Sequence, residues 1–191
     1  MIHAGDMIEN AVTGERLRFH RTSAETNGEL VVVETFVQPG GQVAAAHAHP
    51  HQQERFVVVE GSVGFKRGRE KLVAGPGDEV VVEPGTAHKF WNAGDTEARF
   101  FCEIRPAFQF ERLIETMFGL AVDGKTNKKG MPQPLRLAPI AKAHFDDVRL
   151  PVVPAWMQRS ALAMGAPIGR ILGYGATYEP VAALRPAYAL I

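Results

Sequence analysis

Two different patterns of apolar and polar positions occupy the two parts of the chain. In the first part, apolar residues gather in short runs rich in Val and Phe, separated by brief breaks that contain glycine, proline or charged residues. This spacing is typical of antiparallel strands in a sandwich or barrel, and no helical periodicity of useful length occurs here. We therefore predict a mainly β domain, with an N-terminal arm, over residues 1–107. Its clearest strands are expected at 16–20, 29–37, 55–61, 79–84 and 98–104.

From residue 108 the apolar positions recur at helical spacing. A first amphipathic helix is predicted from Phe110, Leu113, Ile114, Met117, Phe118 and Ala121. A second helical pattern includes Leu137, Ile140, Ala141, Phe145 and Val148. A third run, 157–175, is apolar but contains Pro167 and several glycines, and it predicts a buried or kinked pair of helices. We expect residues 108–191 to form a helical extension that packs on the β domain or on a dimer partner.

Composition narrows the class of protein. The chain has 21 basic and 21 acidic residues, so no general basic field exists to attract nucleic acid or an anionic membrane. The N-terminal residues form no secretory signal pattern, and no apolar stretch is long enough for a transmembrane helix. Cys102 is the single cysteine, which excludes an internal disulfide and fits a cytoplasmic protein. The apolar segment 155–175 favours a homodimer over attachment to a membrane surface, because soluble monomers avoid large exposed apolar patches.

The stretch "HAHPHQQE" concentrates possible metal ligands. Alternate residues of a strand point to one face, so the side chains of His47 and His49 are expected to project together. Glu54 begins the next strand, and His88 follows a Pro-Gly turn elsewhere in the chain. Imidazole and carboxylate groups suit divalent first-row metals, although isolated histidines are more often surface or turn residues. His51 follows Pro50, which interrupts the strand, and we expect it at the rim or behind the metal ligands.

At these residues the sequence resembles the cupin superfamily. The first cupin motif reads Gly41, "QVAAA", His47, Ala48, His49, "PHQQ", Glu54, "RFVVVE", Gly61. The second reads Gly77, "DEVVV", Glu83, Pro84, Gly85, "TA", His88, "KFW", Asn92. Every spacing of both motifs is met, and one position departs from the pattern, because Glu83 stands where the family usually has proline. The resemblance covers roughly residues 30–105 and leaves out the C-terminal third.

The resemblance implies an antiparallel jelly-roll β-barrel that holds one metal ion. Carried over to this chain, the metal ligands are His47, His49, Glu54 and His88. Three imidazoles and one carboxylate accept Fe, Mn, Ni, Cu or Zn, and the spacing does not select among them.

Strand parity predicts which side chains surround the expected metal site. Side chains on the same face as the ligands are expected either to line a small-molecule pocket or simply to fill the barrel. These residues are Val43, Ala45, Phe56, Val58 and Phe90.

Members of the cupin superfamily include enzymes, storage proteins and ligand sensors, so the fold alone does not select a function. Our first hypothesis is a metal-dependent enzyme, dioxygenase-like, that acts on a small organic substrate. The alternatives are a non-catalytic protein that binds or senses a small ligand, and a metal-dependent isomerase or decarboxylase. A DNA-binding role is not expected, because the extension has no basic recognition helix.

Overall fold

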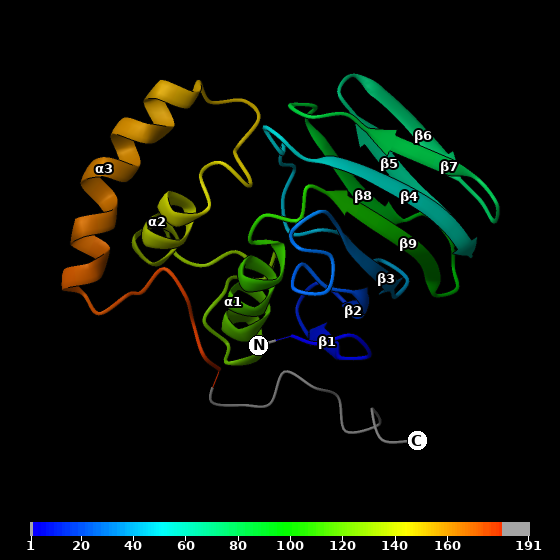
Figure 1. The fold of residues 1–191 in the computed structure, drawn as a ribbon, viewed down its shortest axis with the longest axis horizontal. Coiled ribbons are helices and arrows are strands. Elements are labelled where there is room, and N and C mark those ends of the chain that lie inside the picture. Colours follow the sequence, from blue (N-terminus) through cyan, green and yellow to red (C-terminus); the bar gives the residue numbers. More distant parts are fainter. Residues whose placement is uncertain (1, 181–191) are drawn as a thin grey trace.

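A computed structural model describes residues 2–180 of the chain, in which nine strands precede three helices (Figure 1). The strands are β1 (Met7–Asn10), β2 (Glu15–Arg21), β3 (Val31–Val37), β4 (Gln53–Glu60), β5 (Val63–Arg67), β6 (Glu70–Ala74), β7 (Glu79–Val82), β8 (His88–Asn92) and β9 (Ala98–Arg105). The helices are α1 (Phe110–Val122), α2 (Pro134–Ala143) and α3 (Ala155–Ile171).

The strands form two antiparallel sheets. One has six strands in the order β1-β2-β3-β9-β4-β7, and the other has three in the order β6-β5-β8. Consecutive strands are therefore not always neighbours, as is usual in jelly-roll folds. The predicted class, a mainly antiparallel β fold followed by helices, is confirmed. All five predicted strands are present, whereas β1, β5, β6 and β8, each four or five residues long, were not predicted individually.

Alternation within the central strands places one face of each in the core. In β4, Glu54, Phe56 and Val58 are buried while the residues between them are partly exposed. The neighbouring strand β9 pairs Cys102 with Phe56 and Phe100 with Val58, so buried positions meet buried positions across the ladder. This register follows from the period of two, because a slip by one residue would turn the apolar face of β4 to solvent.

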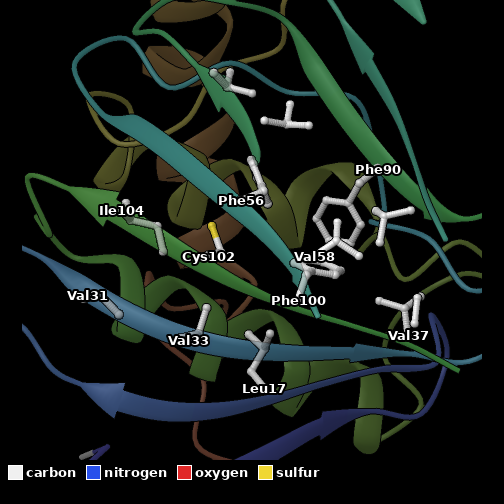
Figure 2. Close-up of a cluster of buried hydrophobic side chains, with 14 of the residues drawn as sticks. Leu17, Val31, Val33, Val37, Phe56, Val58, Phe90, Phe100, Cys102 and Ile104 are labelled. Carbon is white, nitrogen blue, oxygen red and sulfur yellow. The ribbon is translucent and has the colours of Figure 1, made fainter. Parts of the chain in front are cut away.

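Four phenylalanines join the two sheets across the core, and Figure 2 shows three of them, Phe56, Phe90 and Phe100. The ring of Phe56 lies 5.1 Å from that of Phe65, 6.1 Å from that of Phe90 and 5.9 Å from that of Phe100, measured between centroids. Phe56 and Phe100 belong to the larger sheet, and Phe65 and Phe90 to the smaller one. Burial of one such side chain contributes about 1.5–3 kcal/mol, so this cluster is a main source of cohesion between the sheets.

The helices lie on one side of the β domain (Figure 1). α1 covers the residues of the first helical pattern, which confirms that prediction. Its Phe118 is buried in the core, and Phe110, Ile114 and Met117 pack against the core from outside. The apolar stripe of α1 therefore completes the β domain. No helix among residues 2–180 is long and apolar enough to cross a membrane.

The second helical pattern runs past the end of its helix. α2 ends at Ala143, so Phe145 and Val148 lie in the turn that follows. Phe145 is nevertheless buried, because this turn folds back onto the β domain through a bridge between Ala48 and Arg149. The apolar pattern of the sequence therefore extends beyond the end of the helix.

The prediction for the third run was wrong. Residues 155–171 form one continuous helix, α3, in which only Ala166 and Gly169 are buried. Pro167 has no amide hydrogen to donate to the carbonyl oxygen of Ala163, one turn earlier. The helix tolerates this because Pro167 and Ala163 both lie on its exposed side. The small residues face α2: a Cβ atom on Gly169 would lie 2.3 Å from the carbonyl oxygen of Leu135.

The strands end at Arg105 and the helices begin at Phe110, on either side of the expected boundary between residues 107 and 108. The division into two domains stays a prediction. The last part of the expected extension, 181–191, lies outside the described residues.

Candidate metal centre

Four possible metal ligands from separate parts of the chain meet inside the β domain. His47 and His49 lie in the irregular segment before β4, Glu54 is the second residue of β4, and His88 is the first residue of β8. Each offers one ligand atom, and these four atoms lie within 4.8 Å of one another. His49, Glu54 and His88 are buried, and His47 is partly buried. The ligands that the cupin resemblance implies are thus brought together by the fold.

Backbone hydrogen bonds join the two segments that carry the histidines. His47 and His88 each donate an amide hydrogen bond to the carbonyl oxygen of the other, at 3.0 and 2.8 Å. The amide of Gly85 also donates to the carbonyl oxygen of His49 at 2.7 Å. Gly85 has φ +79, a conformation that favours glycine, which accounts for its place in the turn before His88. The spacing of the side chains is therefore set by main-chain geometry.

All three imidazole rings are oriented in the same way by backbone carbonyls. Nδ1 of His47 lies 2.9 Å from the carbonyl oxygen of Ala45, and Nδ1 of His88 lies 3.0 Å from that of Thr86. Nδ1 of His49 lies 2.7 Å from the carbonyl oxygen of Asp147. A carbonyl oxygen only accepts, so each Nδ1 carries the hydrogen and each Nε2 is the atom available to a metal. Carbonyl partners of this kind commonly orient metal-binding histidines.

The atoms that face one another fit a divalent metal ion. Nε2 of His49 is buried and makes no hydrogen bond, although Oε1 of Glu54 lies 3.5 Å away. Nε2 of His88 lies 2.7 Å from Oε2 of Glu54. Leaving a buried nitrogen without a partner costs about 1–3 kcal/mol, which a bound ion would offset. Three imidazole nitrogens and one carboxylate are a donor set that first-row transition metals accept.

The charges of the four groups depend on one another. Burial lowers the pKa of His47 to about 3, and the neighbouring His88 and His49 act in the same direction. Burial would raise the pKa of Glu54, but the charges of His49 and His88 and the contact with His88 outweigh it and lower the pKa to about 2. Burial would lower the pKa of His88, but its hydrogen bond to Glu54 and the charge of that carboxylate outweigh it and raise the pKa. An anionic carboxylate thus sits among imidazoles, as cation binding requires.

The candidate metal centre opens into a cavity of about 690 Å³. The cavity lies between the β domain and the helices, and His47, His49 and Glu54 are part of its wall. Most of the remaining wall is apolar: it includes Phe100 from β9 and Met117 from α1. A cavity of this size accommodates a small organic molecule next to the four donor atoms.

The predicted pocket residues fall into two groups. Val43, Ala45, Phe56 and Phe90 line the cavity. Val58 points into the packed core (Figure 2) and is not among the lining residues that the structure describes. His51 is exposed in the segment before β4 and does not belong to the cluster of four.

Three polar residues of the site were not singled out from the sequence. Glu15 and His144 line the cavity, and Asp147 supplies the carbonyl that orients His49. The sequence contains one indication that Glu15 is buried: it occupies the same alternate positions of its strand as the apolar residues Leu17 and Phe19. Asp147 could not be found in this way, because its role comes from a contact with His49, 98 positions earlier, and His144 acts through its contact with Asp147.

Comparisons with known proteins agree with the region covered by the two motifs. Residues 33–103 match the family model described as "Cupin domain". The chain is 43% identical over 73 residues to a germin-like protein of Arabidopsis thaliana, subfamily T member 3, which covers 36% of this chain and 32% of that protein. It is 36% identical over 87 residues to subfamily T member 2 of the same plant, covering 42% of this chain and 39% of the relative. The matched segment thus spans between about a third and two fifths of these relatives.

Among solved structures, KdgF from a Halomonas species is similar with a TM-score of 0.48 and 17% identity. That similarity covers 55% of this chain and 91% of the other.

Proposed function

Since this chain belongs to the cupin superfamily, we propose that it binds one divalent metal ion and uses it as a dioxygenase-like enzyme on a small organic substrate. One observation carries the proposal: the buried cluster of three histidines and a glutamate forms part of the wall of a large, mostly apolar cavity. A purely structural metal site is usually closed on all sides, whereas catalysis needs access for a substrate.

We expect one group of residues to bind the metal ion and another to bind the substrate. His47, His49, Glu54 and His88 would hold the ion, and the carboxylate would offset part of its charge. An Fe, Mn, Ni, Cu or Zn ion held there supplies Lewis-acid polarisation, and the redox-active ones also supply electrons to O₂. The apolar wall, including Phe90 and Phe100, would exclude water and hold the substrate against the donor atoms.

The nature of the wall supports a substrate class. Aromatic and aliphatic side chains dominate it, so the favoured molecule is small and largely apolar, with an aromatic or carbonyl group. Such a molecule loses water contacts on entry, which provides most of the binding free energy.

Metal content tests the first half of the proposal. Protein purified without an affinity tag is analysed for Fe, Mn, Ni, Cu and Zn, as wild type, His49→Ala and His51→Ala. His51 is the matched control, because it lies two residues away but is exposed and outside the cluster. We expect about one ion per chain in the wild type and in His51→Ala, and a large loss in His49→Ala. Equal metal content in all three proteins would refute the ligand assignment.

Oxygen consumption tests the second half. The protein is loaded anaerobically with Fe(II) and then mixed with O₂ and a panel of small aromatic and carbonyl compounds. We expect substrate-dependent O₂ uptake that His49→Ala abolishes. Conversion of a compound without O₂ would instead favour the isomerase or decarboxylase alternative. Tight binding without any conversion would favour a binding or sensing protein.

The homodimer also stays a proposal. α3 exposes a set of large apolar side chains on one side, and soluble monomers seldom display contiguous apolar patches. Light scattering on the eluting protein measures the mass directly, and a monomer at micromolar concentration would contradict the proposal. These exposed residues are Trp156, Met164, Ile168 and Ile171.

A further inference from the structure

A buried carboxylic acid that is not a member of the metal cluster lies in the same cavity. Glu15 is the first residue of β2, and its side chain lies on the inward face together with Leu17 and Phe19. Only 8% of Glu15 is exposed, and the residue lines the cavity that contains His49 and Glu54. An acidic residue at this position is unusual, because glutamate is rarely buried without a partner.

Among the buried glutamates that the structure describes, Glu34 and Glu54 have partners and Glu15 has none. Glu34 is 4% exposed and binds His20 at 3.0 Å and Arg99 at 3.0 Å. Glu54 contacts the histidines of the metal cluster. Within residues 2–180, by contrast, no group donates a hydrogen bond to the carboxyl of Glu15 and none forms an ion pair with it. Its polar atoms therefore face the cavity with their hydrogen-bonding capacity unused.

Two other polar side chains on the cavity wall form hydrogen bonds with the backbone. Oδ1 of Asn10 accepts hydrogen bonds from the amides of Val12 and Thr13. The amide of Gln158 donates to the carbonyl oxygen of Val153. Glu15 differs from both, because its carboxyl forms no hydrogen bond with any other part of the chain that the structure describes.

Burial also determines the protonation state of this group. Removal from water raises the pKa of Glu15 to about 8, and the negative charge of Glu54 acts in the same direction. The carboxyl is therefore mostly protonated at neutral pH, and a protonated carboxyl has one O–H donor and one carbonyl acceptor.

We infer that Glu15 is the recognition group of this cavity: its buried carboxyl, to which no described residue hydrogen-bonds, donates a hydrogen bond to an oxygen atom of a bound molecule that is otherwise apolar. The ligand class is thus an apolar compound with a carbonyl or similar acceptor oxygen, such as an aryl ketone. The inference rests on the proposed function only in treating this cavity as the substrate site. It names Glu15 as a specificity-determining residue beyond the metal ligands.

A matched set of ligands tests this role in protein freed of metal by a chelator. Acetophenone has an acceptor oxygen, ethylbenzene has the same carbon skeleton without it, and 1-phenylethylamine has a positive charge instead. Affinities are measured by calorimetry for the wild type, Glu15→Gln and Glu15→Leu. Glu60→Gln is the control, because Glu60 is an exposed residue on the outside of β4. Circular dichroism confirms that each variant is folded.

We expect the wild type to prefer acetophenone to ethylbenzene, and Glu15→Leu to lose about tenfold in affinity for acetophenone alone. Glu15→Gln should retain most of the preference, because its amide still donates, and Glu60→Gln should behave as wild type. Equal losses for acetophenone and ethylbenzene would overturn the inference, as would wild-type protein that binds no acetophenone. Preferred binding of the amine, abolished in Glu15→Gln, would show a charged carboxylate and also overturn it.

A negative result in this test can be distinguished from a negative result in the tests of the proposed function. Ligand binding to the metal-free protein requires neither metal nor O₂, so absent O₂ uptake leaves the role of Glu15 intact. Conversely, unaltered acetophenone binding in Glu15→Leu would remove Glu15 from the site without affecting the metal ligands.

Discussion

Nδ1 of His49 donates a hydrogen bond to the backbone carbonyl oxygen of Asp147 across 2.7 Å, although 98 positions separate the two residues. Two backbone hydrogen bonds between Ala48 and Arg149, at 3.0 and 2.9 Å, run beside it. The turn after α2, residues 144–149, therefore holds the segment that carries the candidate metal ligands His47 and His49. The helical extension contributes to the candidate metal centre as well as covering it.

The side chain of His144 should strengthen metal binding without touching the metal. Its Nδ1 lies 2.7 Å from Oδ2 of Asp147, and both residues are buried, so the pair stabilises the turn that orients His49. We predict that His144→Ala lowers metal affinity by about 10- to 100-fold, measured by competition with a chelator. His144→Asn should recover much of the affinity, because its side-chain amide can donate to the same carboxylate. His20→Ala is the control, since His20 also pairs with a carboxylate but lies outside the cavity. Unchanged affinity in His144→Ala would show that the turn keeps its shape without this pair.

Metal binding should stabilise the fold. An ion that binds only the folded protein raises the free energy of unfolding by about 2.7 kcal/mol at a concentration 100 times its dissociation constant. We predict that a chelator lowers the melting temperature of the wild type and of His51→Ala, but not that of His88→Ala, which lacks a ligand at the start of β8. A chelator-induced shift of the same size in His88→Ala would mean that the ion binds elsewhere.

Glu15 should make the stability of the metal-free protein depend on pH. Its pKa is about 8 in the folded chain against an ordinary value of 4.5, so the folded state holds the proton more tightly than the unfolded state. The contribution of Glu15 to the free energy of unfolding is then greatest below pH 4.5 and falls between pH 4.5 and about 8, by at most about 1.4 kcal/mol per pH unit. Glu15→Gln removes this titration, so its stability relative to the wild type should increase from pH 5 to pH 8. Urea denaturation at both pH values measures the difference. A constant difference would show that Glu15 titrates normally.

The contact between α2 and α3 should tolerate no side chain at Gly169. A Cβ atom there would lie 2.3 Å from the carbonyl oxygen of Leu135 and 2.9 Å from the ring of Pro139. We predict that Gly169→Ala costs about 1–3 kcal/mol of stability, seen as a lower melting temperature and faster proteolysis of the extension. Gly165→Ala is the control one turn earlier, where the new atom meets only the Cβ atom of Ala138 at 3.3 Å. Equal effects of the two substitutions would contradict a specific close approach at Gly169.

Much of the β domain could be predicted, because local patterns carry the necessary information. Strand alternation marked Phe56 as inward-facing, and the helical stripe through Ile114 and Met117 marked the side of α1 that packs on the core. The third helix was misjudged because its overall apolar composition indicated burial, whereas α3 buries only small residues against α2. Composition reports how apolar a segment is but does not show which residues find a partner.

The four candidate ligands could be named before the fold was known, because their residue types and spacing follow both cupin motifs. Local chemistry restricts such a set: two histidines on alternate positions project to one side, and a turn before β8 brings His88 to them. The cavity, the unpartnered carboxyl of Glu15 and the bond from His49 to Asp147 could not be named in the same way. Each depends on segments that are distant in the chain, and their approach results from the packing of the helices on the sheets. Long-range packing of this kind leaves no period or spacing in the sequence from which it could be read.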